Sequence, residues 1–150
     1  SLTELKPGDR LKAAAAPAVG GRPFAISCTF TNTQANTILV SHGGTYLGYA
    51  LHIRDGQLTL SVRRAPDDNH EVALPAPTDG KAHRVRATVT PDGKLRLQLD
   101  EQPEVVATGT GLISKQPAED FCVGHDAANP AAKYAQPEPF RGTLTQLEIR

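Results

Sequence analysis

The stretch Gly48–Arg63, GYALHIRDGQLTLSVR, decides the fold of this chain. On both sides of its central Asp55-Gly56 pair, apolar and polar residues alternate, which is the pattern of strands that are buried on one face only. Asp-Gly readily adopts positive φ, so the pair predicts a tight hairpin turn whose twist matches that of the strands. The apolar face of this hairpin must be covered, so the stretch predicts a second sheet packed against it.

Similar short segments lie on both sides of the hairpin. Turn signals such as Pro91-Asp92-Gly93 separate them, and no helical period of any length occurs. The pattern predicts about ten to twelve strands in an all-β, antiparallel two-sheet sandwich of the jelly-roll type. Strands are expected at 23–31, 37–41, 49–54, 58–63, 82–90, 94–99, 121–123 and 140–149, with shorter ones at Leu11, Val72–Leu74 and Val105–Val106, and loops at 64–71, 109–117 and 126–139.

The parity of apolar residues predicts how these strands pack. In the last strand the apolar parity changes between Leu144 and Leu147, so we expect an extra residue, a β-bulge, near Thr145-Gln146. Tyr49 takes an inward position in the central hairpin. Nearly complete burial is expected for Leu51, Ile53, Leu60, Val85 and Leu97.

The two cysteines, Cys28 and Cys122, lack any metal-binding spacing. Cys28 shares the inward parity of its strand, whereas Cys122 lies between two inward-facing residues and is expected to face outward. Opposite facing disfavours a disulfide, which needs Cβ atoms within about 4.5 Å. We expect one core thiol and one surface thiol, with a bridge as the alternative because parity changes at bulges.

Length and charge narrow the class of protein. At 150 residues the chain suits one domain that buries roughly 68–70% of its unfolded surface. Lys and Arg number 16, as do Asp and Glu, so net charge favours neither nucleic acid nor an anionic membrane as a partner. No apolar run approaches the ~20 residues of a membrane span. We expect 1–21 to form an N-terminal arm or linker and 22–150 to form the domain.

Several motifs follow one another along the chain. They are 22–27 (RPFAIS), the glycine loop and hairpin of 44–62, 79–88 (DGKAHRVRAT), 92–97 (DGKLRL), 121–126 (FCVGHD) and 139–149 (PFRGTLTQLEI). In this order they resemble a laminin-G-like, concanavalin A-like domain. Within that superfamily, 111–117 (GLISKQP) and 133–140 (KYAQPEPF) are most similar to the accessory domain that follows the catalytic domain in some bacterial arylsulfatases. The chain departs from many relatives at Ala82, in place of Trp, and at Asp100-Glu101, in place of Asp-Gly.

The resemblance implies a function as well as a fold. It implies a non-catalytic accessory module of a larger enzyme, such as a sulfatase, that binds glycan or packs against the adjacent catalytic domain. It also implies an extracellular or periplasmic location. The superfamily includes glucanases, lectins and calcium-dependent adhesion modules, so the fold alone does not decide the function. A glycan-active hydrolase and a purely structural domain are the alternatives.

The arrangement of acidic residues favours a non-catalytic protein. Retaining glucanases place an acid and a nucleophile about 5–5.5 Å apart, through carboxylates that alternate along one strand. No expected strand here has that pattern, and Asp67, Asp68 and Glu71 fall in an expected loop. The sulfatase signature, a Cys or Ser followed by x-Pro-x-Arg, does not occur in the sequence. We therefore expect no enzymatic activity from this chain itself.

Two groups of residues are candidates for ligand binding. Tyr46 and Tyr134 lie in expected loops and could offer aromatic platforms to sugar rings. If the strands at 49–54 and 82–90 share one sheet, outward basic residues form a stripe that could hold the sulfate or carboxylate groups of an anionic polysaccharide. The alternative for this stripe is an ordinary soluble sheet face. The outward basic residues are His52, Arg54, Arg84, Arg86, Lys94 and Arg96.

No cofactor motif occurs in the sequence. Laminin-G-like domains often carry calcium at a rim of the sandwich, and the resemblance makes Asp126 with Asn129 the position for such an ion. Calcium needs six to eight oxygen ligands, and no DxDxDG loop supplies them here. The five His residues show no HxxxH or HExxH spacing, and His83 is expected in the core or at its rim.

Overall fold

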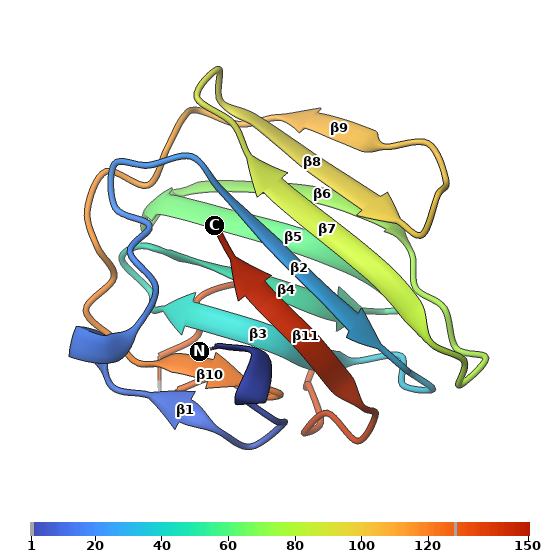
Figure 1. Ribbon diagram of the computed structural model, residues 1–150. Coiled ribbons are helices and arrows are strands. Elements are labelled where there is room, and N and C mark those ends of the chain that lie inside the picture. The colour runs from blue at the N-terminus through green and yellow to red at the C-terminus, as the bar shows by residue number, and fades with distance from the viewer. Residues whose placement is uncertain (1, 128) are drawn as a thin grey trace.

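The structure is a computed structural model that describes residues 2–127 and 129–150 (Figure 1). Two single-turn 3-10 helices, η1 (Leu2–Glu4) and η2 (Ala13–Ala15), lie near the start of the chain. The strands are β1 (Arg10–Leu11), β2 (Phe24–Phe30), β3 (Thr37–Gly43), β4 (Gly48–Arg54), β5 (Gln57–Ala65), β6 (Asp68–Pro75), β7 (His83–Val89), β8 (Lys94–Leu99), β9 (Val105–Thr108), β10 (Phe121–Val123) and β11 (Leu144–Ile149).

The strands form two antiparallel sheets that pack face to face (Figure 1). Sheet A has six strands in the order β1-β10-β3-β4-β5-β6, and sheet B has five in the order β11-β2-β7-β8-β9. The predicted all-β two-sheet sandwich is therefore confirmed. No helix in residues 2–127 and 129–150 has the length and apolar character needed to cross a membrane.

The central hairpin has the predicted turn. Asp55 and Gly56 have φ angles of 50° and 77°, so both central residues are left-handed, as a type I′ turn requires. This turn sets the register between β4 and β5, in which Leu51 lies opposite Leu60. Both leucines are fully buried, so the hairpin turns one apolar face towards sheet B.

The core lies between the sheets and contains the residues expected there. The apolar positions alternate along β2, β7 and β8, whereas β3 and most of β4 are buried on both faces. Tyr49 is fully buried and packs against Phe24, with ring centroids 4.8 Å apart. The expected burial is confirmed for Leu51, Ile53, Leu60, Val85 and Leu97, each at most 1% exposed.

Both cysteines are free thiols, as the opposite parity of their positions favoured. Their burial agrees with the prediction for only one of them. Cys28 is buried in the core, as expected. Cys122 was expected to be a surface thiol, and that expectation is wrong because the residue is also buried. Beside it, Ser41 donates a hydrogen bond to the backbone carbonyl of His125 at 2.8 Å. The segment after β10 therefore folds back over the outer face of sheet A and covers the thiol.

The expected loop at 64–71 is mostly strand. β5 extends to Ala65 and β6 begins at Asp68, so only Pro66 and Asp67 connect them. Several of the polar residues that suggested a loop lie on the edge strand β6. There Asp68 accepts a hydrogen bond from Arg64 and forms another with a ring nitrogen of His70. Polar composition therefore marked an exposed edge here, and not a break in the sheet.

The bulge expected near Thr145-Gln146 is confirmed in β11. The register with β2 shifts between Thr145 and Glu148, and Gln146 has a φ of 55°. The strand itself begins at Leu144 and is shorter than the expected 140–149.

The first residues of the described chain contact both sheets. β1 pairs with β10 at the edge of sheet A, and η1 packs beside β11 of sheet B. Arg10 also forms an ion pair with Asp120 at 2.8 Å. The division into an arm at 1–21 and a domain at 22–150 stays a prediction.

Candidate functional site

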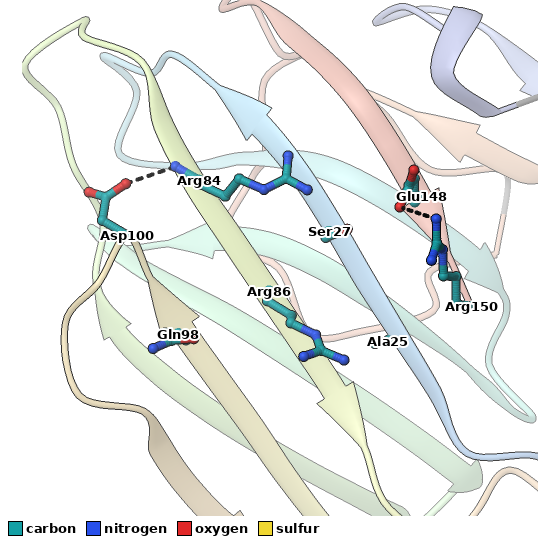
Figure 2. A pocket seen from close by; sticks show the side chains of 8 residues that line it. All are labelled: Ala25, Ser27, Arg84, Arg86, Gln98, Asp100, Glu148 and Arg150. Atoms are coloured by element: carbon teal, nitrogen blue, oxygen red, sulfur yellow. Dashed lines mark hydrogen bonds and ion pairs between the residues drawn. The ribbon is translucent and has the colours of Figure 1, made fainter.

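A groove of about 330 Å³ lies on the outer face of sheet B (Figure 2). At this place β2 presents small side chains, Ala25 and Ser27, whereas the neighbouring strands present long ones. In the ladder, Ser27 is in register with Arg86 on β7 and with Glu148 on β11. A row of short side chains between two rows of long ones leaves a trough along β2.

The wall on β7 is cationic. Arg84 and Arg86 both line the groove; in Figure 2 Arg84 reaches from β7 over β2, and Arg86 lies along β7. Both are exposed, because they alternate with the buried core residues Val85 and Ala87 along the strand. Alternate residues of a strand are about 6.6 Å apart and point to the same face, so both arginines lie on the groove side of β7.

Neutral groups position Arg84. Its Nη1 atom donates hydrogen bonds to Thr29 Oγ1 and Gln146 Oε1, each at 3.2 Å. Gln146 reaches this place because the bulge in β11 puts it on the outer face of the sheet. No carboxylate binds the Arg84 side chain among the described residues, so its charge is oriented without being neutralised.

The side chain of Arg86 has no hydrogen-bond or ion-pair partner in the part of the chain that the structure describes. Its neighbours across the ladder are Ser27 and Gln98, which are both neutral and can both donate and accept hydrogen bonds. An unpaired guanidinium beside neutral polar groups can bind an anion without first breaking an ion pair.

The wall on β11 has mixed charge. Glu148 and Arg150 form an ion pair at 3.2 Å, and their side chains are 39% and 81% exposed. Arg150 also exchanges two backbone hydrogen bonds with Ala25, which extends the β11 ladder to the last described residue. The groove therefore has arginines on both walls and one carboxylate on the β11 wall.

One end of the groove is closed by Asp100. Its Oδ1 atom accepts a hydrogen bond from the backbone N–H of Arg84 at 2.8 Å, and its Oδ2 atom lies 2.7 Å from Nδ1 of His83. The other ring nitrogen of His83 lies 2.9 Å from Asp79. Hydrogen bonds from Asp100 and then Asp79 raise the pKa of His83, and the bond with His83 lowers the pKa of Asp100. The Asp100 charge is thus already compensated.

The predicted six-residue basic stripe does not exist. His52 and Arg54 lie on β4 in sheet A, whereas Arg84 and Arg86 lie on β7 in sheet B. The stripe requires the strands at 49–54 and 82–90 to share a sheet, but the chain crosses to the other sheet between β6 and β7. The other two members, Lys94 and Arg96 on β8, share the outer face of sheet B with the groove, and Arg96 pairs with Glu104 at 3.0 Å.

His52 and Arg54 belong to a covered polar cluster. Arg54 binds Glu71 through two hydrogen bonds of 2.6 and 2.7 Å, and Glu71 also accepts a hydrogen bond from Ser61. His52 Nε2 lies 2.7 Å from Ser61 Oγ, and burial lowers the pKa of His52 to about 4. Because Ser61 donates to Glu71, His52 donates to Ser61 through Nε2. His52 is fully buried and is therefore not a surface contact for a ligand.

The two tyrosines lie away from the groove. Tyr134 packs edge-on against His52, with ring centroids 5.1 Å apart, and its hydroxyl donates to Asp126. Burial raises the pKa of the Tyr134 phenol. Tyr46 is 75% exposed in the connection between β3 and β4. Neither ring lines the groove, so aromatic stacking is not part of this site.

The residues at the suggested calcium position do not fit that ion. Both carboxylate oxygens of Asp126 already accept hydrogen bonds, from the backbone N–H groups of Ala127 and Ala131 and from the Tyr134 hydroxyl. Within residues 2–127 and 129–150, no three His, Cys, Asp or Glu side chains are arranged to hold a metal. The Asp126 carboxylate thus already holds its own segment together.

Comparisons with known proteins identify the class of this chain. The Laminin G domain family matches residues 30–150, and the chain belongs to this family. The mouse laminin alpha1 chain, domains LG4-5, has a similar structure, with a TM-score of 0.72 and 13% identity over 93% of this chain and 38% of that chain. No curated protein sequence matches the chain.

Two further solved structures show the same fold. The LG1-3 region of the laminin alpha2 chain has a TM-score of 0.61 and 20% identity, over 96% of this chain and 26% of that one. The binding domain of botulinum neurotoxin serotype C1 has a TM-score of 0.61 and 11% identity, over 85% of this chain and 32% of that one. The chain thus spans well under half the length of these structures.

Sequence reasoning proposed Arg84 and Arg86 but missed Gln146, Glu148 and Arg150. The alternation of Arg84 and Arg86 with core residues was visible in the sequence. The small outward residues of β2 are the signal that could have located the groove, since Ala25 and Ser27 alternate with buried positions. The other three residues come from β11 and its end, which pair with β2 although they are more than a hundred positions away in the sequence. Local sequence patterns do not predict such a long-range pairing.

Proposed function

We propose that this laminin G domain is a non-catalytic binding module that holds an anionic polysaccharide in the groove on sheet B. The observation that carries the proposal is the pair Arg84 and Arg86, two exposed guanidinium groups on one strand that no carboxylate of residues 2–127 and 129–150 binds. A guanidinium group binds a sulfate or carboxylate through two parallel hydrogen bonds. Two of them above a floor of small residues suit an extended, negatively charged chain.

The neutral groups of the groove support this proposal. Ser27 and Gln98 lie in register with Arg86, where they can exchange hydrogen bonds with sugar hydroxyls. The site has no aromatic platform, so charge and hydrogen bonding must supply its affinity. Exposed ion pairs are individually weak and are screened over about 8 Å at physiological ionic strength. Affinity is therefore expected to be modest and to fall steeply with added salt.

The proposal includes an accessory role in a larger enzyme, such as a sulfatase, outside the cytoplasm in an extracellular or periplasmic location. The sequence motifs that resemble sulfatase accessory domains support the link to a sulfatase. Among proteins of similar fold, botulinum neurotoxin type C requires interaction with two ganglioside molecules to enter cells, at 10% identity to this chain. That likeness shows the fold alone, so the groove itself carries the proposal.

A double substitution tests the proposed function. Arg84→Ser with Arg86→Ser is expected to weaken binding to hyaluronate or dextran sulfate oligosaccharides by about tenfold or more, since two charge-assisted contacts are lost. Arg10→Ser with Arg141→Ser removes the same charge away from the groove and serves as the control. Binding is measured by isothermal titration calorimetry, and circular dichroism checks the fold.

Two outcomes would overturn the proposed function. One is equal weakening by the groove variant and by the control variant, which would show that only net charge matters. The other is the absence of binding to both charged oligosaccharides. In that case the outer face of sheet B is better explained as a structural surface or as a docking surface for the parent catalytic domain.

A further inference from the structure

We infer that the groove selects glycans of low charge density, with a single anionic group over Arg84 and Arg86 and a neutral, hydroxyl-bearing unit against Glu148. This inference rests on the proposed function and concerns the class of polysaccharide that the same groove accepts. It follows from how positive and negative side chains are distributed across the four strands that line the groove, β11, β2, β7 and β8.

The cationic pair is the main positive charge of the groove, because the other basic residues of this sheet face on β8, Lys94 and Arg96, do not line it. On the β8 side, Arg96 is already neutralised by Glu104 at 3.0 Å. On the β2 side, the floor consists of the uncharged residues Ala25 and Ser27. The free positive charge of the groove is therefore concentrated on β7, where it matches one sulfate or carboxylate group better than a continuous series of them.

The opposite wall carries a carboxylate at a defined distance. Glu148 is in register with Ser27, and Ser27 is in register with Arg86, so a row across the sheet reads Glu148, Ser27, Arg86. Strands lie about 4.8 Å apart, which puts the backbones of Arg86 and Glu148 roughly 10 Å from each other. A glycan that binds Arg86 and crosses β2 brings its next unit to Glu148.

The chemistry of Glu148 distinguishes the two kinds of neighbouring unit. A carboxylate accepts hydrogen bonds from sugar hydroxyls, which are donors. A second sulfate or carboxylate at this position would face a like charge and be repelled by it. Arg150 offsets part of this charge, but its ion pair with Glu148 is highly exposed and therefore weak.

The test compares two oligosaccharides of equal length at one ionic strength. Hyaluronate has a single carboxylate in each disaccharide, whereas dextran sulfate is densely sulfated, and neutral dextran is the blank. The wild-type domain is expected to bind hyaluronate more tightly per site. Glu148→Gln is expected to raise affinity for dextran sulfate about three- to tenfold and to leave affinity for hyaluronate within about twofold.

A matched control separates a local effect from a general charge effect. Glu138 forms an exposed ion pair with Arg141, much as Glu148 does with Arg150, but it lies in the segment before β11 and does not line the groove. Glu138→Gln makes the same charge change and is expected to leave the ratio of the two affinities unchanged.

The possible failures are distinguishable. Tighter wild-type binding of dextran sulfate, or equal effects of Glu148→Gln and Glu138→Gln on that ratio, would overturn the inference about charge density. If binding in that case is still lost in the Arg84→Ser and Arg86→Ser double variant, the proposed function stands. Binding that survives the double variant would overturn both.

Discussion

Arg84 and Arg86 differ in how their guanidinium groups are held, although they lie two residues apart on one strand. Thr29 and Gln146 orient Arg84, whereas Arg86 has no partner among the described residues. A prepositioned side chain loses less conformational entropy on binding, since its rotamer is already fixed. Arg84 therefore defines the geometry of the site, and Arg86 adds a charge that adapts to the ligand.

Gln146→Ala tests this difference at a single residue. The substitution removes one of the two acceptors that orient Arg84 and leaves both arginines in place, so we expect a several-fold loss of hyaluronate affinity. The free energy of unfolding is expected to change by less than about 1 kcal/mol, because the lost hydrogen bonds are exposed. Gln57→Ala, an exposed glutamine on β5 of sheet A that does not line the groove, is the control for loss of an amide group. Unchanged affinity in Gln146→Ala would mean that Arg84 is not prepositioned by this contact.

Leu97 tests the assignment of the core. It is fully buried on β8, so Leu97→Ala is expected to lower the free energy of unfolding by about 2–5 kcal/mol, from lost apolar burial and the cavity left behind. Arg96→Ala, on the outward face of the same strand, is expected to cost less than about 1 kcal/mol. The comparison uses urea denaturation midpoints. Similar midpoints for both variants would contradict the assignment of faces on β8.

At the scale of elements, the hairpin of β4 and β5 depends on a backbone shape that few residues adopt. A Cβ atom at Gly56 would meet no atom within 4 Å, so a substitution there changes backbone strain and not packing. With a φ of 77°, Gly56→Ala is expected to destabilise the fold by about 1 kcal/mol. Gly56→Asn should cost less, because Asn tolerates the left-handed region. Equal denaturation midpoints for the two variants would count against this explanation.

The elements show which features sequence patterns could predict. Alternation predicted the strands and their inward faces, and the change of parity near Gln146 predicted the bulge. Alternation could not show what covers the outward face of a strand. His52 and Cys122 point away from the core, but both are buried by the segment that follows β10. Nor does alternation identify a strand that is polar on both faces, which is why the first half of the edge strand β6 has the composition of a loop.

At the scale of the whole molecule, the missing information is the assignment of strands to sheets. Two strands with similar patterns, β4 and β7, lie in different sheets, and this separated the predicted basic stripe into two groups. Arg84 and Arg86 could be proposed because they share one strand. Their partners on β11 could not, because a long-range pairing places them beside β2.

Two buried histidines predict the response of the whole fold to acid. Burial lowers the pKa of both His42 and His52 to about 4, below the unfolded value near 6.5. Between these values the unfolded chain binds more protons than the folded one. The contribution of the two histidines to the free energy of unfolding is therefore fully present above pH 6.5 and is lost as the pH falls towards 4. At pH 5 each histidine is expected to reduce the free energy of unfolding by roughly 2 kcal/mol.

Denaturation midpoints at pH 7 and pH 5 check this expectation. His52→Gln is expected to lose less stability than the wild type between these two values, because Gln does not ionise. His83, which is partly buried, acts in the opposite direction. Hydrogen bonds with Asp100 and Asp79 raise its pKa, so its contribution to stability is present at low pH and is lost as the pH rises through the folded value. Equal losses in wild type and His52→Gln would show that His52 is not a source of the acid sensitivity.

The alternation of apolar and charged residues after the bulge in β11 limits how this strand can pair with β2 during folding. Leu147 and Ile149 face the core, while Glu148 and Arg150 face the groove. Since side chains alternate, a slip of one residue against β2 would turn this whole set over and bury a carboxylate and a guanidinium. Burial of charges without well-placed partners costs several kcal/mol each, so the misaligned states are strongly disfavoured. The same charges that line the groove therefore help to fix the register of the edge strand β11 against β2.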